Sequence, residues 1–175
     1  CAKYKNKYLG TLGDAGIISL DFGKVITTGE GGMCVTNRRN LDAKMRILRD
    51  HGMSKKKRYW HDVIGYNYRM TDIQAALGIS QLERLEEFVI KRHHIANRYN
   101  ELLKDLPVMI PFQHPKSYSS YHLYIIRINL KKVKKPHNDV YKALHAKGIL
   151  ANLHYIPVYR QPFYEQMGFV KGYCR

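Results

Sequence analysis

Apolar positions along the chain alternate between short continuous runs and longer stretches with helical spacing. Gly16–Leu20 (GIISL) and Gly32–Thr36 (GMCVT) are short apolar runs typical of buried strands. Between them lies DFGKVITTGEGG, a turn-rich connection with four glycines. The pattern therefore predicts two strands joined by a glycine-rich loop.

A helix is predicted next, because Leu41, Met45 and Leu48 recur at a spacing that places them on one helical face. Asn40 precedes these positions and can cap the helix with its side chain. Gly52 follows the basic last turn and could be the first residue beyond the helix, where glycine is favoured. An irregular stretch rich in Arg, Tyr and Gly then runs to Met70.

The clearest helix in the chain begins after Thr71. Thr71 and Gln74 fit a capping box, and Asp72 complements the positive end of the helix dipole. The apolar pattern runs to about Leu106, which is long for a globular helix, so we expect a bend or a change of domain around residues 88–95. The apolar positions of this helix are Ile73, Leu77, Leu82, Leu85, Phe88, Ile95, Tyr99 and Leu102.

The C-terminal part continues the alternation of strands and helices. Tyr121–Ile128 (YHLYIIRI) and Ile149–Ile156 (ILANLHYI) are predicted strands, and between them Pro136 and Gly148 bracket a helix. Strands that alternate with helices in this way are typical of an α/β protein. We expect this β–α–β tail to form a small second domain.

The net charge of +16 is the strongest feature of the composition. Such a charge could bind nucleic acid, attract a diphosphate-bearing small molecule, or reflect a lysine-rich proteome without any specific partner. The basic runs Lys55–Arg58 and Lys131–Lys135 lie between periodic segments, which favours exposed loops. Neither run carries the aromatic pattern of RNA-binding strands, so a nucleic-acid partner is the weakest of the three readings.

Three cysteines, far apart and odd in number, favour a reducing cytoplasm. No CxxC pair and no zinc-like spacing occurs, so no metal site is predicted, and Cys34 is expected to be a small core residue. No apolar run reaches the roughly eighteen residues of a membrane span. The first residues, CAKYKNKYLG, lack the apolar stretch of a signal peptide.

Lys24 is the main candidate for chemistry, because it lies in the glycine-rich loop among small and apolar residues. Partial burial would disfavour its ammonium form and supply the free amine that Schiff-base chemistry requires. The plainer reading is a solvated surface lysine, which most lysines are. The glycines lack the spacing of a dinucleotide-binding fingerprint, and no Walker loop is present.

Three segments together resemble a known family. SLDFGKVITTGEGGMCVTN is similar to the lysine segment of the DegT/DnrJ-like sugar-nucleotide aminotransferases, which are fold-type I enzymes dependent on pyridoxal phosphate (PLP). RDHGMSKKKRYWHDVIGYNYRMTDIQAALGISQLERL resembles the second signature of that family, and GILANLHYIPVYRQPFY the third. This resemblance implies that residues 1–90 are the end of the large PLP-binding domain and that residues 91–175 belong to the small C-terminal domain.

The resemblance also assigns roles to single residues. Lys24 would carry PLP as a Schiff base, Ser19 would bind the cofactor phosphate, and Asn67 would reach that phosphate from the neighbouring subunit. Arg69 would lie at the dimer interface near the substrate. A hydroxyl and an amide can donate to phosphate oxygens, and a guanidinium suits an anionic substrate. Without the resemblance, Ser19 is a strand residue, Asn67 a turn former and Arg69 half of a surface ion pair.

His154 and Tyr155 match positions near the substrate pocket, although a strand histidine is more often a hydrogen-bonded structural residue. The implied reaction moves an amino group from glutamate to a nucleotide-linked 4-keto-6-deoxy sugar, for surface polysaccharide or glycan biosynthesis. KKRYWHDVIGYNYRM resembles the GDP-perosamine synthase branch, whereas HYIPVYRQPFYEQMGFVKG resembles the branch that makes UDP-4-amino-4,6-dideoxy-N-acetyl-altrosamine. We favour a UDP-sugar slightly, because the second match lies nearer the expected sugar pocket.

The family pattern includes parts that this sequence does not contain. An aspartate that keeps the PLP ring nitrogen protonated is expected a few residues before Cys1, and an aromatic residue that stacks on the ring is expected further upstream. We therefore expect the sequence to be part of a longer chain that works as a homodimer with a shared active site. The alternative is a basic α/β protein without enzymatic activity that binds nucleic acid or regulates another protein.

Overall fold

The computed structural model describes residues 2–54 and 56–174, and the chain divides into two compact units. The first unit comprises Cys1–Lys104 and Pro111–Tyr124, and the second comprises Asp105–Ile110 and Ile125–Arg175. The predicted boundary at residue 90 between two domains of the family fold stays a prediction.

The predicted strands of the first unit form an antiparallel pair. β3 (Gly16–Ser19) pairs with β4 (Gly32–Val35) in a register that runs from Gly16 opposite Val35 to Ser19 opposite Gly32. Both strand predictions are confirmed, and the glycine-rich connection leaves from the Ser19 end. A second small sheet has the order β2-β1-β6, from β1 (Lys3–Tyr4), β2 (Lys7–Tyr8) and β6 (Ser117–Tyr118).

The first helix, α1 (Arg39–Arg49), begins one residue before the predicted cap. The cap position is Arg38 and not Asn40, so that prediction is wrong. The helix already begins at Arg39, so Asn40 lies inside its first turn, and the Arg38 side chain makes no capping hydrogen bond. Gly52 lies one position later than predicted, since its N–H donates to Ile47 O at 2.9 Å and closes a Schellman-type end.

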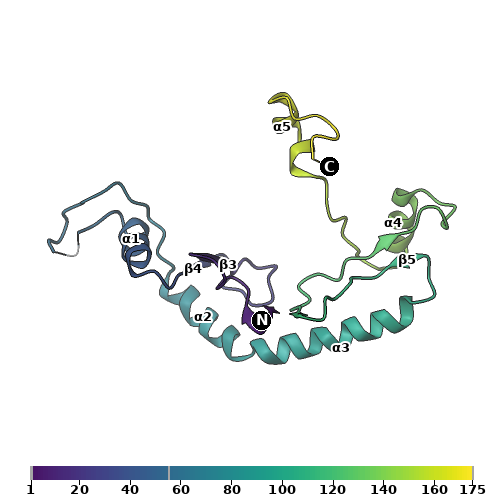
Figure 1. Cartoon of the computed structure of the whole chain (residues 1–175), viewed down its shortest axis with the longest axis horizontal. Helices are drawn as coiled ribbons and strands as arrows, with labels where there is room; N and C mark the ends of the chain where they lie inside the picture. The colour runs from purple at the N-terminus through teal and green to yellow at the C-terminus, as the bar shows by residue number, and fades with distance from the viewer. Residues whose placement is uncertain (1, 55, 175) are drawn as a thin grey trace. The chain divides into compact units, whose positions relative to one another are not determined.

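Two consecutive helices follow, α2 (Asp72–Glu83) and α3 (Leu85–Leu103), with a break at Arg84 (Figure 1). The capping box between Thr71 and Gln74 is confirmed in both directions. The predicted bend at 88–95 is wrong in position, because α3 is continuous through those residues.

One part of the small core of the first unit lies between α3 and the segment 119–124, and Leu20 is buried separately after β3. Val89 and Ala96 of α3 are buried, as is Tyr121. Arg92 Nη1 donates to Tyr121 O at 2.9 Å, and Tyr124 Oη donates to Asn100 Oδ1 at 2.7 Å. Burial raises the pKa of the Tyr124 hydroxyl, which keeps it a hydrogen-bond donor.

In the second unit the predicted helix is confirmed, one predicted strand is much shorter than expected, and the other is absent from the described residues. Of the residues 121–128, only Arg127–Ile128 form a strand, because 119–124 is held by side chains of α3. Residues 149–156 form no strand, since no other described segment pairs with them. The elements of this unit are β5 (Val108–Met109), β7 (Arg127–Ile128), α4 (His137–Ala146), η1 (Val158–Arg160) and α5 (Pro162–Gln166).

The glycine signal at the end of α4 is confirmed. Gly148 has a φ of 76° and its N–H donates to His145 O at 2.9 Å. The next N–H, that of Ile149, donates to Leu144 O at 3.0 Å. These two bonds are the pair that defines a Schellman motif.

Much of the apolar surface of the chain is exposed. The accessible surface of the chain is 14686 Å², and large apolar side chains are exposed in each unit. Ile73 of the predicted apolar stripe is 84% exposed, and Cys34 is exposed rather than part of a core. Exposed apolar surface of this extent marks interaction surfaces.

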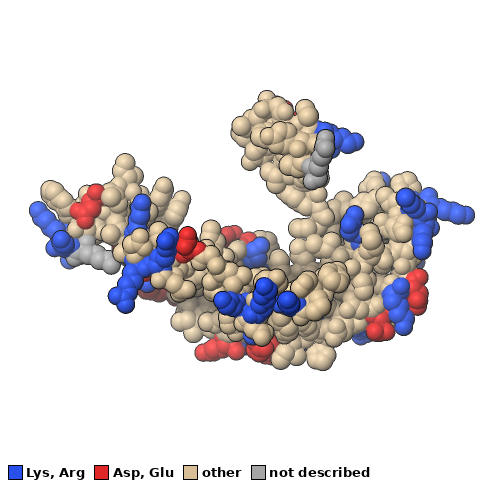
Figure 2. Space-filling view, in the orientation of Figure 1, with Lys and Arg blue, Asp and Glu red and all other residues tan. Residues whose placement is uncertain are grey.

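Three further findings concern the distribution of charge, the hydropathy of the helices and the side chains that could bind a metal. Lys and Arg side chains form several separate groups on the face shown in Figure 2. Among the described residues, no helix is both long enough and apolar enough to cross a membrane. In the same part of the chain, no three His, Cys, Asp or Glu side chains lie close enough to hold a metal ion together.

Candidate active site

The lysine loop, residues 20–31, connects β3 to β4 and carries Lys24. Its first turn is built on Asp21, whose Oδ1 accepts from Gly23 N and whose carbonyl O accepts from Lys24 N, both at 3.0 Å. Ser19 is the last residue of β3 and is exposed. The Lys24 side chain is also exposed, so the expected partial burial is not found in this chain. Within the described residues its amine has no acidic partner.

The second half of the lysine loop folds back on Leu20. The carbonyl O of Leu20 accepts from Thr28 N at 2.9 Å and from Thr27 Oγ1 at 3.2 Å. The N–H of Leu20 donates to Gly31 O at 2.9 Å. Thr28 is only 3% exposed, and its hydroxyl donates to Glu30 O at 2.9 Å. The loop is therefore anchored near both ends, and Lys24 lies between the anchors.

A second loop, residues 65–70, carries Asn67 and Arg69 and lies along the last turn of α1. The N–H of Tyr66 donates to Leu48 O at 2.6 Å, and the N–H of Tyr68 donates to Arg49 O at 2.9 Å. In return, the N–H of His51 donates to Tyr66 O at 2.8 Å. These bonds use carbonyls that a helix end leaves unsatisfied. Asn67 is exposed between them, as a predicted phosphate ligand must be.

The backbones of the two segments cross at two glycines. A Cβ added to Gly65 would lie 2.0 Å from Gly52 N and 2.5 Å from His51 C. A Cβ added to Gly52 would lie 1.8 Å from Val63 O, and Gly52 also has a φ of 71°. Only glycine fits at either position, because the contacting atoms are backbone atoms that cannot rotate away.

Arg69 pairs with Asp50, with 3.3 Å between Nε and Oδ1. The Arg69 side chain is 63% exposed and the Asp50 side chain 37% exposed. The pairing holds the guanidinium at one edge and leaves the rest accessible to an anion. The surface ion pair that the sequence suggests as the alternative role of Arg69 is thus present. It leaves the guanidinium accessible, so it is compatible with a substrate role.

We expect Asp50→Asn to alter the free energy of unfolding by at most about 1 kcal/mol, because exposed ion pairs contribute little. If Arg69 contacts substrate, the same change should lower kcat/KM for the anionic substrate by more than this stability loss accounts for. Urea unfolding and steady-state kinetics measure the two effects. Asp14→Asn is the matched control, since Asp14 pairs with Arg38 at 3.3 Å on an exposed surface. Equal effects of both variants on kcat/KM would contradict the assignment.

The remaining predicted site residues lie in the second unit. His154 and Tyr155 are exposed, and their ring centroids are 5.8 Å apart. The structure thus places Ser19 at the end of β3, directly before the loop that carries Lys24, and Asn67 and Arg69 together on another loop. The roles of these residues stay predictions.

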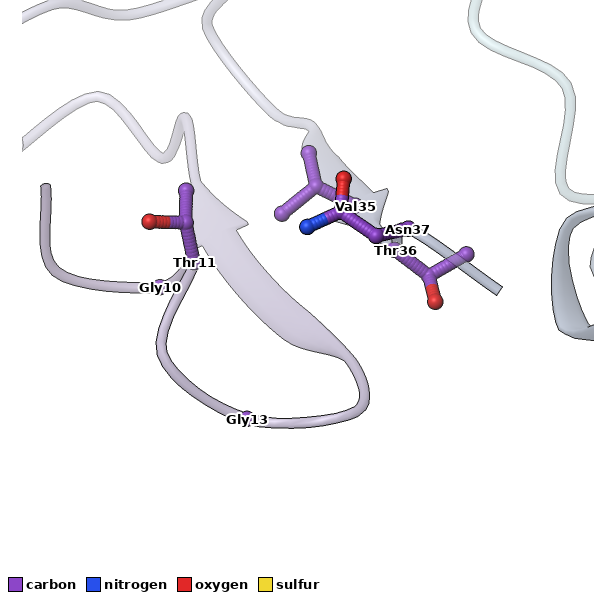
Figure 3. Close-up of a pocket in the computed structure, with 6 residues that line it drawn as sticks. All are labelled: Gly10, Thr11, Gly13, Val35, Thr36 and Asn37. Carbon is purple, nitrogen blue, oxygen red and sulfur yellow. The ribbon is translucent and has the colours of Figure 1, made fainter. Parts of the chain in front are cut away.

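Two hollows in the described part of the chain are each too small to hold a cofactor. One hollow lies at the end of the β3–β4 pair opposite to Ser19 and encloses about 80 Å³ (Figure 3). The other lies between α3 and the segment 121–124 and encloses about 170 Å³. Ligand sites are usually about 300–1,000 Å³. The first is lined by Gly10, Thr11, Gly13, Val35, Thr36 and Asn37, and neither includes a predicted site residue.

Three features of the site were not anticipated from the sequence. Asp50 orients Arg69, Gly52 and Gly65 form a backbone crossing, and Gln74 binds the lysine loop in addition to capping α2. The only sequence signal for the crossing is a glycine in each of two irregular segments, because the contact between them is not local. For Asp50 and the second role of Gln74, the sequence gives no signal.

Comparison with known proteins identifies the family. Residues 1–173 match the DegT/DnrJ/EryC1/StrS aminotransferase family. The chain is 41% identical over 172 residues to the UDP-4-amino-4,6-dideoxy-N-acetyl-beta-L-altrosamine transaminase of Helicobacter pylori, covering 95% of this chain and 45% of the relative. It is 37% identical over 165 residues to the GDP-perosamine synthase of Escherichia coli O157:H7, covering 94% of this chain and 44% of the relative.

Solved structures of aminotransferases also superpose on this chain. PseC of Helicobacter pylori, an aminotransferase involved in the biosynthesis of pseudoaminic acid, superposes with a TM-score of 0.85 at 38% identity, covering 97% of this chain and 46% of that one. The PMP form of Spr1654 from Streptococcus pneumoniae gives a TM-score of 0.86 at 28% identity, covering 95% of this chain and 44% of that one. The chain spans about 45% of the length of the relatives it matches. The chain belongs to the DegT/DnrJ/EryC1/StrS aminotransferase family and has part of the α/β fold of fold-type I PLP enzymes.

Proposed function

We propose that the complete gene product is a PLP-dependent aminotransferase that moves an amino group from glutamate to a nucleotide-linked 4-keto-6-deoxy sugar. The observation that supports this most directly is Lys24, an accessible amine without an acidic partner in the described residues, on an anchored loop of an aminotransferase family member. The product would feed surface polysaccharide or glycan biosynthesis. In support, the relatives include a spore coat polysaccharide biosynthesis protein of Bacillus subtilis.

The residues present fit PLP. Lys24 supplies a primary amine, Ser19 a hydroxyl and Asn67 an amide, and all three side chains are exposed and make no hydrogen bond within the described part of the chain. Amines bond aldehydes, while hydroxyl and amide groups donate to phosphate oxygens. When bound, PLP supplies an electron sink for the carbanion formed during amino transfer. Asn67 would act in the site of the neighbouring subunit.

The chain's own residues would supply the proton transfers and the orientation of substrates. The amine of Lys24, when not bonded to the cofactor, would act as general base and acid: it would remove the proton from the donor carbon that bears the amino group and, in the second half of the reaction, deliver a proton to the sugar carbon that receives the amine. Arg69 would bind an anionic group of the substrate through the part of its guanidinium that Asp50 leaves open. His154 and Tyr155 would contribute a hydrogen-bonding edge near the sugar.

A UDP-sugar is favoured slightly over a GDP-sugar. Identity is 41% to the relative named for a UDP-linked sugar and 37% to the one named for GDP-perosamine. The segment with His154 and Tyr155 resembles the former branch, and it is expected nearer the sugar. A homodimer with a shared active site is part of the proposal. A cytoplasmic location is also proposed, and the free thiols of Cys34 and Cys174 support it.

The test uses the complete gene product. We expect the purified protein to be yellow, and borohydride to fix the cofactor on the peptide that contains Lys24. With glutamate as donor, a panel of UDP- and GDP-linked 4-keto-6-deoxy sugars should yield an amino sugar from at least one member, measured by mass spectrometry.

Two outcomes would contradict the proposal. One is a colourless protein that transfers no amino group to any member of the panel. The other is a colourless protein that binds DNA with a steep salt dependence, which would favour the basic binding protein instead.

A further inference from the structure

Gln74 makes contacts in two directions from the first turn of α2. Its Oε1 accepts from Thr71 N at 3.1 Å, and its own N–H donates to Thr71 Oγ1 at 3.3 Å, which completes the capping box. Its Nε2 donates to Glu30 O at 2.8 Å, across 44 residues of sequence. A capping box requires only the oxygen of the side chain, so the amide nitrogen is free for this second bond.

The contact around this bond is tight. A Cβ added to Gly31 would lie 2.3 Å from Thr28 Oγ1 and 3.0 Å from Met70 Cε. A Cβ added to Gly78 of α2 would lie 2.9 Å from Thr28 Cγ2. The end of the lysine loop therefore rests on the start of α2, and Gln74 supplies the side-chain hydrogen bond that joins them.

We propose that Gln74 is a positioning residue that ties the lysine loop to the loop carrying Asn67 and Arg69. The second loop ends directly before Thr71, whose N–H donates to Gln74 Oε1. The lysine loop includes Glu30, whose carbonyl O accepts from Gln74 Nε2. One side chain thus fixes both loops at the same helix start. The effect of this arrangement on the chemistry of Lys24 rests on the proposed function. The tie, which is the hydrogen bond from Gln74 to Glu30, does not.

The Gln74→Glu variant removes the hydrogen bond to Glu30, the tie, but keeps the capping hydrogen bond from Thr71 N. A glutamate keeps the oxygen that accepts from Thr71 N, but it has no N–H to donate and brings a carboxylate against Glu30 O. Gln81→Glu makes the same chemical change later in α2 and is the matched control. Gln74→Ala removes both contacts and shows the combined effect.

Hydrogen exchange of the complete, cofactor-free gene product tests the tie. In Gln74→Glu, the amides of Leu20 and Thr28 should exchange about 5- to 10-fold faster than in the unchanged protein, as loss of one hydrogen bond implies. The amide of Ala75, which donates to Thr71 O, should keep its rate, and Gln81→Glu should leave all three unchanged. Unchanged exchange in the lysine loop would overturn the proposal, and so would equal acceleration at Ala75.

The cofactor-bound protein tests whether the tie acts on Lys24. The pH at which the visible absorption of bound PLP changes should shift in Gln74→Glu but not in Gln81→Glu, because the lysine loop moves only in the former. Equal pH midpoints in all three proteins would overturn the positioning role. If the unchanged protein holds no PLP, the proposed function fails while the exchange experiment still decides the tie.

Discussion

Lys24→Ala is expected to lower the rate of amino transfer by at least about 100- to 10,000-fold, the range that a positioned acid–base group contributes. The loss of the covalent link to the cofactor adds to this effect. The rate is measured as amino-sugar formation from glutamate by the complete gene product. Borohydride should then fix no cofactor on this chain.

Lys44→Ala is the matched control, because Lys44 is an exposed lysine of α1 that lies outside both site loops. It should retain the activity and the yellow colour of the unchanged protein. Lys24→Arg keeps the positive charge but cannot form the same bond to an aldehyde, so it should be as inactive as Lys24→Ala. An active Lys24→Arg variant would show that only the charge matters and would remove Lys24 from the chemistry.

The elements that the sequence predicted correctly depend on residues close together in the chain. The capping box needs only Thr71 and Gln74, and the end of α4 needs only Gly148 and the two carbonyls before it. The strands Gly16–Ser19 and Gly32–Val35 pair with each other across one loop. In each case the partner lies within a short stretch, so a local pattern carries the information.

The predictions that failed depend on partners elsewhere. Residues 149–156 have the composition of a strand, but a strand forms only where a neighbour supplies hydrogen bonds, and no described segment does so. The burial of Lys24 was expected from its apolar neighbours in sequence, whereas burial requires walls from other segments. Asn40 is not the cap, because α1 already begins at Arg39, one residue before it.

The candidate site shows the same division. The residue types of the site follow from its motifs, but the contacts that hold them do not. The tie between Gln74 and Glu30 spans 44 residues, and the crossing of Gly52 and Gly65 joins two irregular segments. Neither contact has a periodic signature, since both depend on how the chain folds between them.

Gly65→Ala is expected to lower the free energy of unfolding by about 1–3 kcal/mol, the usual cost of overpacking a site that cannot expand. The new Cβ would lie 2.0 Å from Gly52 N, so one backbone segment must move. Gly52→Ala should cost at least as much, because its positive φ adds strain to the close contact with Val63 O. Urea unfolding of the complete gene product at fixed protein concentration measures both changes.

Gly13→Ala is the matched control, because its Cβ would meet only Ala15 O at an ordinary 3.6 Å. It should leave stability within about 1 kcal/mol of the unchanged protein. The double change at Gly52 and Gly65 should cost less than the sum of the single changes, since one separation of the segments relieves both contacts. Additive losses would mean that the two glycines act independently and that no crossing exists.

The same displacement should reach Asn67, which lies two residues beyond Gly65 and between the bonds to Leu48 and Arg49. If Asn67 holds the cofactor phosphate, Gly65→Ala should weaken PLP binding more than its stability loss alone explains. PLP titration of the cofactor-free protein, at a temperature where all variants are folded, measures this difference. An unchanged PLP affinity would show that the Gly52–Gly65 crossing does not position Asn67 for the phosphate. The crossing would then stabilise only the end of α1.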